Sequence, residues 1–63
     1  MVLYTIEYTC GGEHGIDQVE CDVDDDRLAL EGLRVNLSWK GFEYDDILNM
    51  KARIVNMEWL DDW

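Results

Sequence analysis

Residues 2–10 alternate between two faces, and this period of two constrains the fold more than any other feature of the chain. One face carries Val2, Tyr4, Ile6, Tyr8 and Cys10, and the other carries Leu3, Thr5, Glu7 and Thr9. Such alternation, with many β-branched and aromatic residues, is typical of a strand. The segment GGEHG follows and has three glycines in five residues, which predicts a turn. Because IDQVECDV alternates again, we predict a β-hairpin over residues 2–23.

Residues 25–39 are compatible with two structures. Asp25 or Asp26 is a suitable start for a helix, because aspartate is a good N-cap. A helix through Trp39 would be apolar on two opposite faces, with Leu28, Val35 and Trp39 on one and Leu30, Leu33 and Leu37 on the other. That pattern suits a fully buried helix, for which 63 residues leave little room. Residues 33–39 also alternate, so we predict one to two helical turns at 25–31, a break at Gly32 and a strand at 33–39.

The remaining segments complete the predicted fold. We expect a turn at Lys40–Gly41, a short strand from Phe42 to Tyr44 and a last strand over residues 52–60. DILNMK is also compatible with one helical turn that leads into this strand. Both faces of the last strand carry apolar residues, which predicts a central position in the sheet. The prediction is a single α+β domain over residues 1–63, with an antiparallel sheet of about four strands and one short helix.

The charge of the chain limits what it can bind. Five Lys and Arg residues against fifteen Asp and Glu residues leave a formal net charge of −10. Unaided binding to nucleic acid or to an anionic membrane requires basic residues and is therefore disfavoured. A cationic partner is favoured. No apolar run approaches the ~18 residues of a membrane span, and the N-terminus lacks a basic signal region, so we expect a cytoplasmic protein with reduced cysteines.

Two patterns were considered as metal sites. Asp22, Asp24 and Asp26 have the spacing of a calcium-binding EF-hand loop, but Arg27 stands where that loop requires glycine. A zinc site from Cys10, His14 and Cys21 lacks a fourth ligand and a CxxC motif. We therefore expect buried structural cysteines, an exposed His14, and neither metal nor cofactor.

No residue pattern supports catalysis. A nucleophile needs a base and an orienting group, but the only histidine lies in the predicted turn and Ser38 is the only serine. The acid pairs Asp45–Asp46 and Asp61–Asp62 would need a pocket that separates their pKa values. A chain this small has little room for one, so we predict that the protein is not an enzyme.

The acidic residues form two groups in the sequence. ECDVDDD places five acids within seven residues, and EYDD and WLDDW form the second group. If the strand continued to Asp24, the carboxylates of Glu20, Asp22 and Asp24 would stand on one face about 6.6 Å apart, twice the phosphate interval along one DNA strand. The predicted partner-binding residues are Glu20, Asp22, Asp24, Asp25, Asp26, Glu43, Asp45, Asp46, Asp61 and Asp62.

By these acidic segments, its size and its α+β pattern, the chain resembles the small acidic inhibitors of bacteriophages, including anti-CRISPR proteins and other DNA mimics. The resemblance implies a stoichiometric inhibitor, without enzymatic activity, that binds the basic nucleic-acid-binding groove of a host protein in the cytosol. A Cas subunit, a restriction enzyme, a glycosylase and a polymerase are all compatible partners. The resemblance transfers no functional residues.

A second hypothesis is a small structural or interaction module. Such a module would bind through apolar area, using an unpaired sheet edge or an exposed Trp63. The two hypotheses predict opposite responses of binding to salt.

Overall fold

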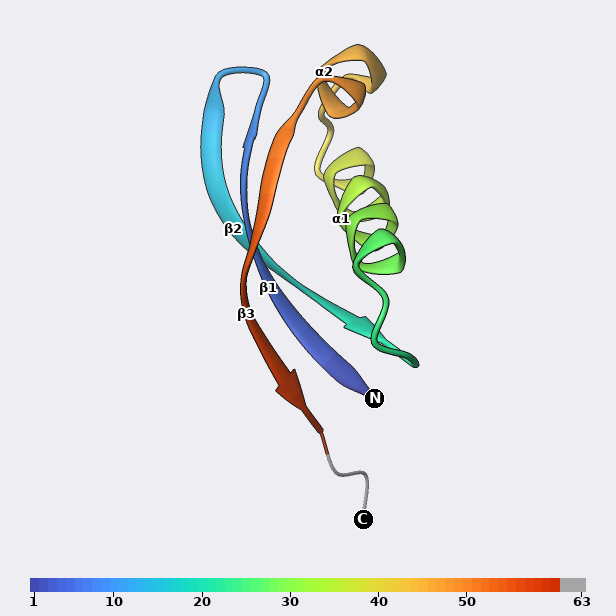
Figure 1. Cartoon of the computed structure of the whole chain (residues 1–63). Helices are drawn as coiled ribbons and strands as arrows, with labels where there is room; N and C mark the ends of the chain where they lie inside the picture. Colours follow the sequence, from blue (N-terminus) through green and yellow to red (C-terminus); the bar gives the residue numbers. More distant parts are fainter. Residues whose placement is uncertain (61–63) are drawn as a thin grey trace.

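The computed structural model describes residues 1–60 and shows a three-stranded antiparallel sheet with two helices (Figure 1). The elements, in chain order, are β1 (Val2–Cys10), β2 (Glu13–Cys21), α1 (Asp26–Trp39), α2 (Tyr44–Leu48) and β3 (Lys51–Trp59). The strand order is β2-β1-β3, so the first strand is central. The α+β class and the antiparallel sheet are confirmed, while the sheet has three strands instead of about four, and there are two helices instead of one.

The predicted hairpin is confirmed, although β2 begins earlier than expected, at Glu13, and ends at Cys21 instead of Val23. β1 and β2 pair from Val2 opposite Cys21 to Cys10 opposite Glu13. Gly11 and Gly12 alone make the turn, with φ values of 58° and 80°. Two consecutive positive φ values match the right-handed twist of the strands, and glycine adopts them without steric strain.

The prediction of a strand at residues 33–39 was wrong, because α1 runs without a break through Gly32. The side chain of Asp25 starts the helix by accepting a hydrogen bond from the backbone N–H of Arg27 at 2.9 Å. The helix buries one stripe against the sheet and leaves its second apolar stripe exposed. The buried stripe is Ala29, Leu33 and Leu37, and the exposed one is Leu28, Val35 and Trp39.

Gly32 allows close packing of α1 on β2. A Cβ atom at this position would lie 2.6 Å from Cγ1 of Val19, closer than two carbon atoms can approach. The glycine that ends the helix is Gly41, with a φ of 96°. There the backbone N–H groups of Gly41 and Phe42 bond to the carbonyl groups of Ser38 and Leu37, which is the Schellman arrangement.

The predicted strand from Phe42 to Tyr44 was also wrong. Tyr44 is the first residue of α2, which packs beside the hairpin turn (Figure 1). Phe42 instead turns inward and makes an edge-to-face contact with the Tyr8 ring, with the ring centroids 6.3 Å apart. The helical turn that DILNMK allowed as an alternative is present as part of α2, and Ile47 is its buried residue.

β3 is an edge strand, not the central strand that its sequence predicted. Its register on β1 shifts between Thr5, opposite Asn56, and Ile6, opposite Ile54, so Val55 is an extra residue in a β-bulge. The bulge places Ile54 and Met57 on the same face of the sheet. Apolar residues on two faces of this segment therefore do not indicate burial on two sides.

We predict that Gly32→Ala destabilises the protein by about 1–2 kcal/mol. The gain of about 1 kcal/mol in helix propensity is outweighed by overpacking against Val19. Urea unfolding of Gly32→Ala in the wild-type and Val19→Ala backgrounds measures the effect. In the Val19→Ala background the substitution should be neutral or stabilising, and an equal penalty in both backgrounds would contradict the packing contact.

Candidate functional site

Among residues 1–60, six acidic residues gather at one end of the sheet, where β2 and β3 finish and α1 begins (Figure 1). We call this surface the acidic end; it comprises Glu20, Asp22, Asp24, Asp25, Asp26 and Glu58. Glu20 and Glu58 lie on the sheet face opposite α1 and flank Leu3 from the two neighbouring strands. With one strand between them, their backbones are about 10 Å apart. Glu58 is more than thirty residues from the other members in the sequence, and only the pairing of β3 with β1 brings it there.

The predicted straight row of carboxylates is not formed. β2 ends at Cys21, so Glu20 stands on the strand while Asp22 and Asp24 lie in the connection to α1. Two acids of the acidic end have structural roles. Asp25 caps α1, and Asp24 Oδ1 accepts a hydrogen bond from the Tyr4 hydroxyl at 2.6 Å. The connection is therefore held in place at both contacts.

The Tyr4–Asp24 hydrogen bond links the acidic end to the core, because Tyr4 is buried. The Asp24 carboxylate, together with burial, raises the pKa of the Tyr4 hydroxyl from 10.0 to about 12. The neutral Tyr4 hydroxyl donates its proton to the Asp24 carboxylate, and loss of that proton would place a phenolate and a carboxylate, two negative charges, in contact. Tyr4 therefore remains neutral and fixes the position of Asp24.

Few positive charges offset the acidic end. Within residues 1–60, the ion pair found there joins Arg27 Nε to Asp25 Oδ1 at 3.9 Å, and the Arg27 side chain is 91% exposed. Such a pair contributes little to stability. The carboxylates of Glu20, Asp22, Asp26 and Glu58 are all on exposed residues, so this surface retains a strong negative potential.

Three acids of the second predicted group lie at the opposite end of the molecule. Glu43, Asp45 and Asp46 belong to α2 or its N-cap, beside the hairpin turn. The molecule is 38 Å long, so the structure separates the two groups. Glu13 joins this second group through β2, which sequence proximity did not reveal. The predicted residues Asp61 and Asp62, and Trp63, lie outside the described residues.

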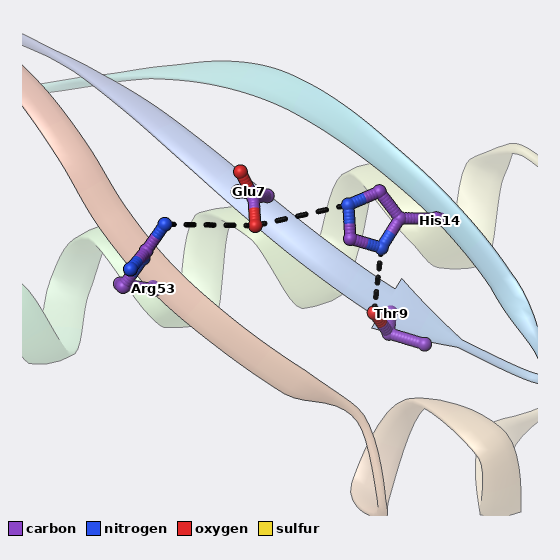
Figure 2. Close-up of polar contacts among 4 residues, drawn as sticks. All are labelled: Glu7, Thr9, His14 and Arg53. Carbon is purple, nitrogen blue, oxygen red and sulfur yellow. Dashed lines mark hydrogen bonds and ion pairs between the residues drawn. The ribbon is translucent and has the colours of Figure 1, made fainter.

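A mixed charge network crosses the sheet face opposite α1 (Figure 2). Glu7 Oε1 lies 3.7 Å from both His14 Nε2 and Arg53 Nη2, and Thr9 Oγ1 lies 3.0 Å from His14 Nδ1. The network joins all three strands. His14 is exposed as predicted, although it belongs to β2 and not to the turn.

The two cysteines are buried and free, as the alternation predicted. Cys10 and Cys21 lie at opposite ends of the hairpin, while His14 is on the other face of the sheet. The three side chains therefore do not converge on a common zinc site. Burial is the main cause that raises the pKa of each thiol, with nearby carboxylates adding to it.

Exposed aromatic residues form a different surface along α1 and α2. Trp39 is 85% exposed and Tyr44 is 73% exposed. A shallow groove of about 290 Å³ runs between the two helices; its lining includes Val35, Phe42, Tyr44 and Leu48. This is the apolar surface that the second hypothesis requires.

The comparisons with known protein families, curated proteins and solved structures find no match to this chain. In the part of the chain that the structure describes, no helix is both long and apolar enough to cross a bilayer. Residues 1–60 also contain no cluster of three His, Cys, Asp or Glu side chains with the proximity that a metal ion requires.

We predict that stability falls at alkaline pH and that Tyr4 contributes to this loss. The folded state keeps the Tyr4 proton up to about pH 12, whereas an unfolded tyrosine loses it near pH 10. The contribution of Tyr4 is thus complete below pH 10 and is lost between pH 10 and 12. Urea unfolding between pH 8 and about 11 should show a shallower decline for Tyr4→Phe than for the wild type. The exposed Tyr44→Phe is the control, and an unchanged slope for Tyr4→Phe would contradict this role.

Salt should raise the melting temperature. Raising the ionic strength from about 0.01 M to 0.15 M shortens the Debye length from about 30 Å to 8 Å, which screens repulsion within the acidic end. We expect a gain of several degrees, measured by circular dichroism in dilute solution. A variant with Glu20, Asp22 and Asp26 changed to lysine should respond less, because its net charge is −4 instead of −10. An equal response would show that repulsion at this surface does not limit stability.

Proposed function

We propose that the protein is a non-enzymatic, stoichiometric inhibitor whose acidic end occupies the basic nucleic-acid-binding groove of a partner protein. By its resemblance to acidic bacteriophage inhibitors, it acts in the cytosol of a host bacterium as a DNA mimic of the anti-CRISPR type. A Cas subunit is one partner of suitable chemistry. A restriction enzyme, a glycosylase and a polymerase have the same chemistry in their grooves.

The observation that carries this proposal is that, within residues 1–60, five acids of residues 20–26 and Glu58 of β3 lie at one end of the sheet, with an exposed arginine among them. Such a concentration of like charge opposes folding unless a cation meets it. A basic groove supplies that cation, and long-range attraction speeds the encounter.

The backbone of this surface is held in place before binding. β1 positions Glu20 and Glu58 through its pairing with both neighbours, and Tyr4 and the helix cap hold Asp24 and Asp25. A surface that is ordered in the free protein loses less conformational entropy on binding. This order distinguishes the acidic end from a merely solvated acidic tail.

The structural roles of Asp24 and Asp25 determine which substitutions test the proposal. Reversing either charge would also disturb a hydrogen bond that supports the fold. Glu20, Asp22 and Asp26 are exposed, and no hydrogen bond of their side chains is found within residues 1–60. Their joint change to lysine therefore reverses charge at the acidic end while both supports are kept.

We predict that the triple variant Glu20→Lys/Asp22→Lys/Asp26→Lys loses about 10- to 100-fold in affinity for the partner, because each reversal replaces attraction by repulsion. The assay is capture from a bacterial lysate at low salt, elution with a salt gradient, and identification of the eluted proteins. The affinity for each purified partner is then measured, with duplex DNA as competitor. DNA should displace the protein, and binding should weaken as salt rises.

The matched control is Glu13→Lys/Glu43→Lys/Asp45→Lys, which makes the same charge change at the opposite end. It should weaken binding only slightly, through the loss of long-range steering. If both triple variants lose the same affinity, net charge and not the acidic end determines binding. Binding that DNA does not compete for would contradict mimicry.

The second candidate function is an interaction module that binds through apolar area, and the exposure of Trp39 and Tyr44 favours it. Its binding would persist or strengthen at high salt, since burial of apolar surface is not weakened by ionic screening. In the same capture experiment, a partner retained through the salt gradient and lost on Trp39→Ser would support this function.

A further inference from the structure

The helix-facing side of β3 is incompletely covered. The core contacts of α1 are with β1 and β2, where Gly32 packs on Val19. Every residue of β3 except Ile54 is exposed. On the helix side of the sheet, Met57 is 41% exposed and Trp59 is 60% exposed. Within residues 1–60 no strand pairs with the outer edge of β3, so this edge also presents unpaired backbone groups.

We propose that β3 pairs antiparallel with β3 of a second copy of this chain, which joins the two sheets into one of six strands. The two copies would be related by a two-fold axis perpendicular to the strands, the commonest symmetry of homodimers. This interface shares only Glu58 with the acidic end, and it concerns the assembly of the protein and not the identity of its partner.

The bulge at Val55 selects a second copy over an arbitrary strand. Opposite residues in an antiparallel pair must point to the same face, so two regular identical strands pair only residues an even number of positions apart. The bulge shifts the faces of β3 by one residue at its middle. Two residues that share a face on either side of the bulge are therefore an odd number of positions apart, and such residues can pair between the two strands. A second copy contains the same extra residue, so in this register the two bulges meet at the two-fold axis.

In this register, like faces meet along the strand. On the helix side, Ile54 lies opposite Met57 of the second copy, and Ala52 lies opposite Trp59 of the second copy. Their counterparts on β1 show that all four share this face: Ile6, Tyr4, Tyr8 and Val2. The exposed Met57 and Trp59 side chains thereby gain apolar neighbours.

On the opposite face, the same register places Arg53 against Glu58 of the second copy, and symmetry repeats this pair. Arg53 and Glu58 share that face because they pair with Glu7 and Leu3 of β1. Opposite charges on directly paired strands are favourable. β2 lacks this complementarity, because it carries Glu13, Asp17 and Glu20 and no lysine or arginine. Charge complementarity therefore favours the pairing of β3 with a second β3 over the pairing of β2 with a second β2.

The net charge of −10 on each copy opposes dimerisation over longer distances. Most of the acidic end belongs to β2 and its connection to α1, two strands away from the proposed interface. Salt should screen this repulsion more than it weakens the two charge pairs. The dimer is therefore expected to strengthen with salt, in contrast to the proposed binding of a basic partner.

The first measurement is sedimentation velocity of the full chain over a wide range of concentration. We expect a monomer–dimer equilibrium with a dissociation constant of about 1–100 µM, consistent with an interface smaller than a standard one. The constant should decrease as NaCl rises from about 20 to 300 mM. A monomer at all concentrations up to about 1 mM would overturn the proposal.

Two single charge variants test the register. Arg53→Glu and Glu58→Arg each place like charges opposite each other twice in a homodimer, so each should dimerise about tenfold more weakly than the wild type. Mixed together, they restore both opposite-charge pairs and should form a heterodimer of wild-type affinity. Urea unfolding of each variant confirms that it is folded. Folded variants that dimerise like the wild type, or that fail to associate when mixed, would overturn this register.

The apolar side of the interface is tested with two exposed tryptophans. Trp59→Ser removes a side chain from the proposed interface, whereas Trp39→Ser removes one from the outer stripe of α1. Trp59→Ser should weaken dimerisation about tenfold or more, and Trp39→Ser should leave it unchanged. The reverse result would place the contact between copies on α1 and would overturn the pairing of β3.

Discussion

A single helix has to cover a sheet that is wider than the helix, and most other features of this structure follow from that limit. An α-helix with its side chains is about 10–12 Å across, while three strands occupy nearly 15 Å. Gly32 brings α1 close to Val19 of β2, so the covered part of the sheet is the β1–β2 side. The core is accordingly built from alternate residues of β1, a few residues of β2, one stripe of α1 and Ile47 of α2. β3 receives little cover, and its apolar residues Met57 and Trp59 remain in contact with water.

The distribution of charge follows the same division. The acids concentrate where α1 begins and where β2 and β3 end, beyond the region that the helix covers. The basic residues of β3, Lys51 and Arg53, lie on the open face of the sheet near the other end of that strand. The molecule thus has an acidic surface suited to a cationic partner and a strand edge of mixed charge suited to itself. The two proposed interactions predict opposite responses to salt, so one titration would separate their contributions.

The hairpin and the burial of both cysteines followed from the sequence, because β1 is the central strand and each of its side chains lies on a defined face. The middle of the chain did not follow, since residues 33–39 fit a strand pattern better than a two-faced helix, although they are helical in the structure. The criterion that rejected the helix assumed that both apolar faces must be buried. In the structure Leu28, Val35 and Trp39 remain exposed, so that assumption was wrong.

The glycines of the chain indicated where α1 ends only once their contacts in the folded protein were known. Gly32 appeared to interrupt a helix, yet it provides the close contact with Val19, while Gly41 adopts the positive φ that ends α1. The candidate site shows the same limit. The sequence identified Glu20 and its neighbours by their density, but Glu58 joins them only through the register of β3 on β1. The bulge at Val55, which decides that register, shows in the sequence only as apolar residues on both faces of the segment, a pattern that also fits a central strand.

The two proposed interfaces are geometrically compatible, and together they define an assembly. Pairing through β3 would place the two β2 strands on the outer edges of a six-stranded sheet, about 24 Å apart across five strand intervals. The two-fold axis would direct the acidic ends of the two copies in opposite directions along the strands. Each acidic end, apart from Glu58, would therefore remain free to bind its own partner, with two partner molecules on one dimer. Where a partner is itself dimeric or bound in arrays, the second contact would form at a high effective concentration, and modest affinity at each acidic end would be sufficient for tight binding.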